Sequence, residues 1–173
     1  ISSGLSLINE SSGQIVDRFK ERTMFPIQSY SGRTLGFGGR AFNPNAKAKY
    51  LNSPETLIYH KSKVLYGLNY SKNAIAKEGI CYIVEGYTDV ISMHQNGIEN
   101  VVSASGTALT LEQIKLINRL ANNVVLLFDG DNAGIKATYK SINMILKEGM
   151  NVKIAAFPKG EDPDSFSKKL STD

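Results

Sequence analysis

The second half of the chain carries four short segments that are apolar almost throughout. They cover residues 80–84, 101–102, 124–128 and about 152–157. A strand that is apolar at nearly every position, rather than at alternate positions, is typical of a parallel sheet covered on both faces. The pattern therefore predicts four buried parallel strands.

Helix-length segments separate these strands. The expected helices span residues 88–96, residues 111–120 and a stretch that ends near Glu148. The middle helix begins with a capping box, because Thr110 precedes it and Gln113 follows three residues later. Strand and helix alternate, and crossovers of this kind are right-handed in nearly all proteins. The sequence thus predicts a doubly wound α/β domain with a parallel sheet flanked by helices.

The first half of the chain has a different pattern. Residues 24–28 and 34–37 are apolar-rich and flank a turn at residues 30–32, which is typical of a β-hairpin. Ser53 followed by Pro54 predicts the start of a helix, because Ser is a frequent cap and Pro favours the first helical position.

Charge changes where the pattern changes. Residues 1–78 carry 11 Lys and Arg against 5 Asp and Glu, and residues 79–173 carry 9 against 11, so the halves hold +6 and −2 of the net +4. We expect a smaller basic α+β subdomain over 1–78, before the α/β domain over 79–173. A basic half beside an acidic half suits a polyanion track beside a cation site, although ordinary solvated surface gives the same counts.

Composition narrows the class of protein. The 173 residues are 42% hydrophobic, as in ordinary globular chains, and no apolar run approaches the about 18 residues that a membrane span needs. Cys81 is the single cysteine and there are two His, so neither disulfides nor a zinc site can form within this chain, which fits a cytoplasmic protein. Since the sequence begins with Ile1, we expect an excised, monomeric piece of a longer protein.

Carboxylates follow three of the four predicted strands. Glu85 directly follows the first strand and Asp129 the third, so both emerge at the carboxyl edge of the sheet, where α/β proteins bind ligands. Four further aspartates belong to the same segments: Asp89, Asp131, Asp162 and Asp164. Crowded like charges repel, and a hard cation with oxygen ligands, most often Mg²⁺, relieves that repulsion. The alternative is that Asp-Gly-Asp and Asp-Pro-Asp are ordinary turns and caps.

These acidic segments resemble the motifs of the Toprim family, which primases, topoisomerases and some nucleases share. Residues 85–89 (EGYTD) are similar to its first motif and residues 128–134 (FDGDNAG) to its second. Residues 161–164 (EDPD) and 105–107 (SGT) are similar to further segments of the primase version. The resemblance implies a Toprim-type fold and a catalytic site that uses Mg²⁺, for which Mn²⁺ can substitute.

The basic half is similar to the catalytic core of bacterial replicative DNA primases. The matching segments include residues 17–19 (DRF), 24–27 (MFPI), 36–40 (GFGGR) and 49–56 (KYLNSPET). The resemblance implies an enzyme that makes short RNA primers on single-stranded DNA at the bacterial replication fork, from ribonucleoside triphosphates. It also implies a zinc-binding domain and a helicase-contacting region, both expected in parts of a complete primase outside this sequence.

By this resemblance, Asp129 and Asp131 are the first candidates for metal ligands. Glu85 is either a third ligand or a general base, and the sequence leaves both roles open. The second candidates, acting directly or through water, are Asp89, Asp162 and Asp164. Two cations held about 4 Å apart would activate the attacking 3′-hydroxyl and neutralise charge on the triphosphate.

Six residues are expected to bind the DNA or the nucleotide: Arg33, Arg40, Lys49, Asn52, Lys61 and Lys63. Glu55 is the sole acid within residues 23–63, a composition suited to polyanions. Basic grooves with aromatic platforms hold single strands, so Tyr50 is a candidate for base stacking, with simple packing as the alternative.

Two other functions are compatible with the fold. Another Toprim enzyme, either a topoisomerase or a nuclease, would share the acidic motifs, but a topoisomerase needs a strand-cleaving tyrosine and no Tyr here is marked for that task. A recombination mediator that only binds DNA could dispense with several of the acids. Because all three acidic clusters are present, the sequence favours a primase.

Overall fold

The computed structural model describes residues 4–106, 108–128 and 132–156. The chain divides into two compact units, Ile1–Lys61 and Ser62–Asp173. Residues 62–78 therefore join the second unit structurally, whereas the functional division expected after residue 78 stays a prediction. Within the described ranges, no helix combines the length and apolar character that crossing a membrane requires.

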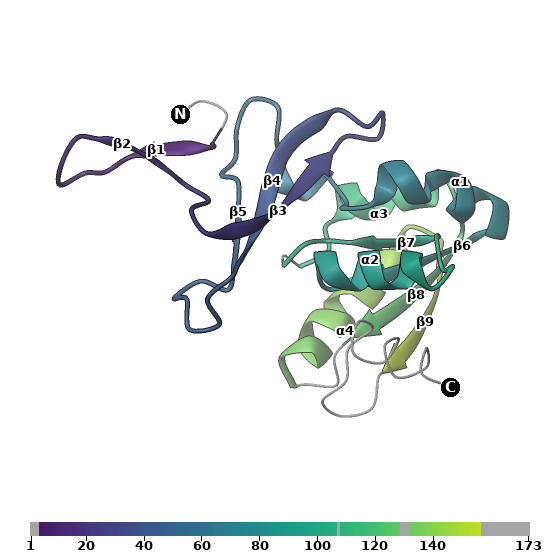
Figure 1. Ribbon diagram of the computed structural model, residues 1–173. Coiled ribbons are helices and arrows are strands. Elements are labelled where there is room, and N and C mark those ends of the chain that lie inside the picture. The colour runs from purple at the N-terminus through teal and green to yellow at the C-terminus, as the bar shows by residue number, and fades with distance from the viewer. Residues whose placement is uncertain (1–3, 107, 129–131, 157–173) are drawn as a thin grey trace. The chain divides into compact units, whose positions relative to one another are not determined.

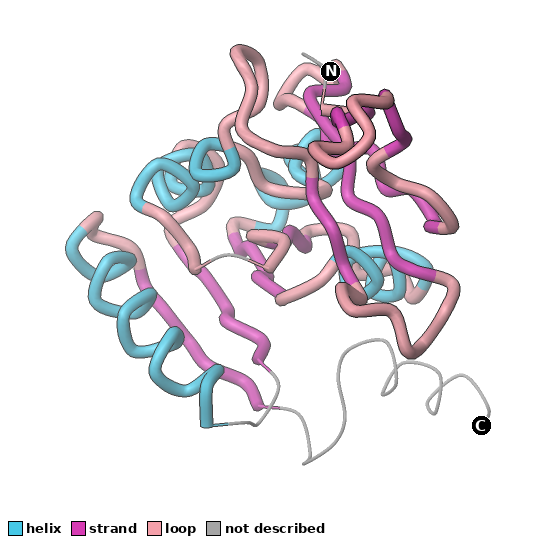
Figure 2. The backbone as a smooth tube through the Cα atoms, turned by 90° about the vertical axis from the view of Figure 1, so that its left-hand side faces the viewer, coloured by secondary structure: helices cyan, strands magenta, loops and turns pink. Residues whose placement is uncertain are grey.

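The first unit is built from two antiparallel sheets. β1 (Ser6–Ile8) pairs with β2 (Ile15–Asp17), and a second sheet has the order β3-β4-β5. β3 (Arg22–Gln28) and β4 (Thr34–Ala41) form the expected hairpin, and β5 (Tyr50–Asn52) adds to the other edge of β4. Figure 2 shows the long strands of this hairpin in magenta. The hairpin prediction is confirmed.

Glycines let other parts of the first unit approach β4 closely. A Cβ on Gly39 would lie 2.7 Å from Cδ1 of Phe19, and a Cβ on Gly36 would lie 3.0 Å from Cδ1 of Tyr59. Tyr59 is only 2% exposed, and burial followed by the charge of Glu55 raises its pKa to about 12. Gly36 thus provides the room in which the Tyr59 ring is buried.

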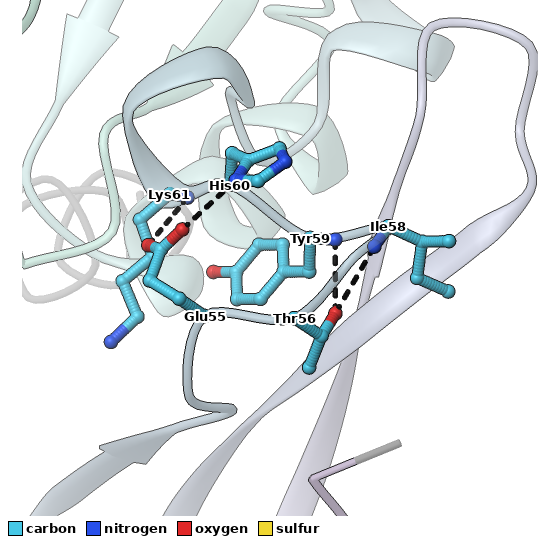
Figure 3. A network of polar contacts seen from close by, with 6 residues as sticks. All are labelled: Glu55, Thr56, Ile58, Tyr59, His60 and Lys61. Carbon is cyan, nitrogen blue, oxygen red and sulfur yellow. Dashed lines mark hydrogen bonds and ion pairs between the residues drawn. The ribbon is translucent and has the colours of Figure 1, made fainter. Parts of the chain in front are cut away.

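The predicted helix at Ser53 and Pro54 is wrong, because side chains there form other bonds (Figure 3). The Ser53 hydroxyl accepts a hydrogen bond from the N–H of Phe37 at 3.0 Å instead of capping a helix. Thr56 Oγ1 accepts from the N–H of Tyr59 at 3.0 Å, and Glu55 Oε1 accepts from the N–H of Lys61 at 3.0 Å. The segment is therefore a closed loop, followed by a single 3₁₀ turn, η1 (Lys61–Lys63).

The second unit contains a four-stranded parallel sheet in the order β7-β6-β8-β9. Its strands are β6 (Ile80–Val84), β7 (Val101–Ser103), β8 (Asn123–Phe128) and β9 (Asn151–Ala156). Its helices are α1 (Leu68–Glu78), α2 (Tyr87–Gln95), α3 (Leu111–Asn118) and α4 (Asn132–Lys147). The predicted doubly wound α/β domain is confirmed, and Figure 2 shows α4 lying alongside the strands that it joins.

In β6, β7 and β8, successive residues enter different apolar clusters, one on each face of the sheet. The expectation that all four strands are buried is wrong for the edge strand β9, where Ile154 is 53% exposed. Cys81 and Ile83 of β6 belong to one cluster and Val84 to the other. The first cluster also contains buried residues of α1, α3 and α4, whereas α2 contributes Val90 and Met93 to the second. Helices thus cover both faces (Figure 1), which explains why β6, β7 and β8 are apolar at consecutive positions.

The start of α3 is fixed by the predicted capping box. Thr110 Oγ1 accepts from the N–H of Gln113 at 3.2 Å, and Gln113 Oε1 accepts from the N–H of Thr110 at 3.0 Å. The same side chains donate to preceding backbone, Thr110 Oγ1 to the carbonyl of Ser62 at 2.6 Å and Gln113 Nε2 to that of Val64 at 2.7 Å. The two side chains of the capping box therefore also hold residues 62–64, at the beginning of the second unit, against the start of α3.

Candidate functional site

The carboxyl ends of β6 and β8 lie side by side, since the two strands pair in parallel with Ile83 opposite Leu126. From β6 the chain passes through α2 to β7 at one edge, and from β8 it passes through α4 toward β9 at the other. The chain thus adds strands in opposite directions on the two sides of the β6–β8 pair, so the strand order reverses between β6 and β8. Open α/β sheets bind ligands at this point, and Glu85 directly follows β6 there.

Glu85 is exposed, and its backbone is held by the neighbouring strand. Ser103, the last residue of β7, is fully buried, and its Oγ donates to the carbonyl of Glu85 at 2.6 Å. The same Oγ accepts from the N–H of Ser105 at 2.8 Å. One hydroxyl therefore joins the Glu85 loop to the loop after β7, a role that sequence reasoning missed although a lone Ser ending an apolar run was a usable signal.

The loop after β7 contains strained backbone. Ser105 has φ of 58° and Gly106 has φ of 77°. This left-handed region suits glycine, but it costs a residue with a Cβ about 1–2 kcal/mol. Strain of this kind is found at functional sites more often than elsewhere, and here it occurs in the loop that braces Glu85.

Two tyrosines support the same corner of the unit. Tyr66 forms a bridge with Ser103, donating its N–H to the Ser103 carbonyl at 2.8 Å and accepting in return at 3.1 Å. Its ring packs edge-on against Tyr87, with centroids 4.6 Å apart. Tyr87, the first residue of α2, is 2% exposed, and burial raises the pKa of Tyr66. The rings fix the start of α2 just beyond Glu85.

Asp89 caps the helix beside the candidate site. It is 7% exposed, and its Oδ2 accepts a hydrogen bond from the N–H of Gly86 at 2.8 Å. A carboxylate there is also favoured by the helix dipole, because it lies in the first turn. The structure therefore assigns Asp89 a structural role in α2, and metal binding by this residue stays a prediction.

The remaining acidic candidates lie outside the described residues. They are Asp129, Asp131, Asp162 and Asp164. Over the part of the chain that is described, no three His, Cys, Asp or Glu side chains form a group able to hold a metal. The adjacent ends of β6, β8 and β9 are described, and the sequence places all four aspartates after β8 or β9.

In the first unit, β4, β5 and the residue before β5 bring together three of the predicted nucleic-acid contacts. Arg40 pairs with Tyr50 across the strands, and its guanidinium carbon lies 5.9 Å from the centre of the Tyr50 ring. Asn52 pairs with Gly38 and points to the same face, because side chains alternate along a strand. Lys49 and Arg40 line a pocket of about 450 Å³.

Two arginines that sequence reasoning missed hold this face in place. Arg22 donates to the carbonyl oxygens of Gly39 at 3.1 Å, Ala48 at 2.9 Å and Lys49 at 3.3 Å. Arg18 donates to the carbonyl of Asn52 at 3.2 Å. These guanidinium groups already donate hydrogen bonds to backbone carbonyls. A count of basic residues therefore overstates the number of cations available to a polyanion.

Two of the other candidates, Arg33 and Lys61, lie elsewhere in the first unit, and the third, Lys63, lies in the second. Arg33 lies in the turn before β4, and seven residues of extended chain separate it from Arg40, or roughly 23 Å. Lys61 ends the closed loop of Figure 3, where its N–H is bound by Glu55. Lys63 is exposed and belongs to the second unit.

A parallel sheet with these crossovers and an acidic residue after its β6 strand defines a Toprim-like domain. The family model described as Toprim-like matches residues 82–167. A second model, described as the N-terminal domain of the DNA primase catalytic core, matches residues 1–74. The chain belongs to the family of bacterial DNA primases of the DnaG type, whose catalytic core it matches.

Individual relatives agree with this assignment. The chain is 48% identical to the DNA primase of Clostridium acetobutylicum over 94% of its length, and 43% identical to that of Halalkalibacterium halodurans over 99%. It spans only 27% and 28% of those two relatives.

Solved structures show the same similarity. A primase domain from Pseudomonas aeruginosa is 42% identical with a TM-score of 0.89, over 97% of this chain and 53% of that one. A DnaG catalytic domain bound to single-stranded DNA is 41% identical with a TM-score of 0.88, over 97% and 55%. The Aquifex aeolicus primase, with zinc-binding and RNA polymerase domains, is 36% identical with a TM-score of 0.88, over 99% and 43%.

Proposed function

We propose that this chain is the part of a DNA primase that transfers nucleotides to build short RNA primers on single-stranded DNA. The observation that carries the proposal is the reversal point between β6 and β8, where the exposed Glu85 is braced by buried Ser103. The carboxyl edge of the sheet at such a reversal point is where α/β domains bind their ligands. The match of residues 1–74 to a primase domain favours this function over a topoisomerase, a nuclease or a recombination mediator.

Primases with Toprim-like domains use a divalent metal, and the donors expected here are oxygen atoms alone. Glu85, Asp129 and Asp131 would hold Mg²⁺, or Mn²⁺ in its place, since carboxylates without Cys or His suit a hard cation. When bound, the cation would neutralise charge on the triphosphate and lower the pKa of the attacking hydroxyl. Glu85 would act as a ligand or as a general base, and Ser103 would fix its backbone in either role.

The template would lie on the basic face of the first unit. Arg40 and Lys49 would bind phosphates, Asn52 would reach a phosphate or sugar, and the Tyr50 ring is close enough to Arg40 for both to face one strand. The similar primase domain bound to single-stranded DNA supports this choice of ligand. Ribonucleoside triphosphates are the proposed second substrate.

The family also supports proposals about the cellular setting. The relatives are bacterial primases, so we propose that the protein acts in the cytoplasm at the replication fork, in contact with the replicative helicase. Zinc would have no part in the site between β6 and β8. That metal is expected in a separate domain, such as the zinc-binding domain of the Aquifex aeolicus structure.

The test combines a metal soak with an activity assay. A crystal soaked in Mn²⁺ should show an anomalous peak within coordination reach of Asp129 or Asp131. Asp129→Ala and Asp131→Ala should each abolish template-directed nucleotide incorporation by the complete protein while leaving the fold intact, because the cations stabilise the transferred charge. Glu112→Ala, on the exposed side of α3, is the matched control. Near-normal incorporation by both aspartate variants would contradict the proposal.

A further inference from the structure

Phe42 has a large apolar side chain that is exposed to solvent. It is 69% exposed, immediately after β4. Its backbone is nevertheless fixed, since the N–H of Phe42 donates to the carbonyl of Glu21 at 3.1 Å. The preceding residue, Ala41, donates its N–H to the carbonyl of Lys49 at 2.9 Å. Two backbone hydrogen bonds therefore hold the chain where it bends after β4, at the base of the exposed ring.

Phe42 lines the same pocket as the two strongest candidates for phosphate binding. The pocket of about 450 Å³ is formed by Thr23, Arg40, Phe42, Pro44 and Lys49, among others. Within the described residues, two cations and no acidic residue line it. Its volume lies in the range of about 300–1,000 Å³ that is usual for small-ligand sites.

Two aromatic rings lie near Arg40. Phe42 follows β4 at a bend and lines the same pocket as Arg40 and Lys49. Arg40 also pairs with Tyr50 across the sheet, 5.9 Å from its ring centre. A ligand of this surface needs an anionic backbone for the cations and a flat, unpaired ring for the aromatic faces. Single-stranded nucleic acid has both, whereas a duplex hides the faces of its bases.

We propose that Phe42 is a stacking platform for one unpaired base of a strand whose phosphates are bound by Arg40 and Lys49. The inference rests on the proposed function. It adds an uncharged residue to the template face, which a search for basic residues in the sequence does not identify. Stacking on aromatic side chains tolerates any base, because every base has a flat face. Phe42 would therefore add affinity for single strands without adding sequence preference.

The first experiment measures binding of a fluorescent single-stranded oligonucleotide to the chain by anisotropy at several salt concentrations. Phe42→Ala should weaken binding roughly 5- to 150-fold without changing the slope of log affinity against log salt, because no phosphate contact is lost. Phe42→Tyr should retain the affinity. Tyr30→Ala, which removes a half-exposed ring of the same unit, should bind as the wild type does.

The second experiment repeats the titration with an oligonucleotide whose central nucleotides lack bases. Phe42→Ala and the wild-type chain should bind this strand equally, since the ring has nothing to stack on. Thermal melting of the variants checks that the fold is kept, as expected for an exposed position.

The outcomes separate the two proposals. Unchanged affinity of Phe42→Ala for the normal strand, or an equal loss on the strand without bases, would overturn the role of Phe42. If Arg40→Ala and Lys49→Ala still flatten the salt slope in that case, the proposed template face survives. A wild-type chain that binds neither strand at low salt would overturn both.

Discussion

Single hydroxyl groups decide much of the geometry around Glu85. Ser103 Oγ is both a donor to the Glu85 carbonyl and an acceptor for the Ser105 N–H, and the residue is fully buried. Buried polar groups that lose a partner cost about 1–3 kcal/mol. The hydroxyl is therefore expected to matter for stability, and through the position of Glu85 for catalysis.

Replacing Ser103 by Ala should lower the free energy of unfolding by about 1–3 kcal/mol, because two backbone groups lose their partner. It should also reduce nucleotide incorporation by the complete protein at temperatures where the variant remains folded. Urea unfolding and an incorporation assay measure the two effects. Ser62→Ala, at an exposed position of the same unit, is the control, and an equal result for both variants would show that the bridge has no importance.

At the scale of elements, the starts of α2 and α3 are fixed by different side-chain arrangements. α2 begins with the Asp89 carboxylate bound to the N–H of Gly86, and α3 begins with the reciprocal bonds of Thr110 and Gln113. The second arrangement was predicted from the sequence because a capping box is local. The first places a carboxylate of the acidic motif in a structural role that motif spacing does not reveal.

Thr110→Ala should destabilise the second unit by about 1–2 kcal/mol, because it removes the helix cap and the bond to the Ser62 carbonyl together. Chemical denaturation followed by circular dichroism measures the change. Lys115→Ala, on the exposed side of the same helix, should cost less than about 0.5 kcal/mol. A loss for Thr110→Ala no larger than that of the control would mean that α3 does not depend on its cap.

At the scale of the whole chain, charge is distributed unevenly between the basic first half and the acidic second half. Residues 1–78 have a net charge of +6, but the side chains of Arg18 and Arg22 donate hydrogen bonds to backbone carbonyls. The cations left for a polyanion are therefore fewer than the number of basic residues, and two of them, Arg40 and Lys49, line one pocket. Binding to single-stranded DNA should therefore be weak and sensitive to salt.

If one or two of Arg33, Lys61 and Lys63 contact phosphates together with Arg40 and Lys49, the affinity for single-stranded DNA should fall with log salt at a slope of about −2 to −3. Lys49→Ala should weaken binding to all sequences alike and flatten the slope by roughly 0.7, because one phosphate contact is lost. Lys140→Ala removes an exposed cation of α4 and should have much less effect. Equal losses for the two variants in an anisotropy titration would place the template on another surface.

The alternation of strands and helices from β6 onward was determined by the sequence alone, whereas α1 lies where the sequence predicted a polar boundary between domains. Consecutive apolar residues such as those of β6 and β8 can be buried only if both faces of the sheet are covered, so local pattern fixes the class of fold. The position of Glu85 at the carboxyl edge followed from the same pattern, since parallel strands end at a common edge. Family motifs then supplied the expected chemistry.

Only the tertiary structure decided how side chains far apart in sequence are used. Ser53 and Pro54 have the local pattern of a helix start, but the Ser53 hydroxyl is bound by Phe37, sixteen residues earlier in the chain. Arg22 carries a charge like any other cation, but it is used to hold the backbone of Lys49. A hydrogen bond between distant segments depends on how strands pair and on which groups burial leaves without water, and neither is contained in a local pattern.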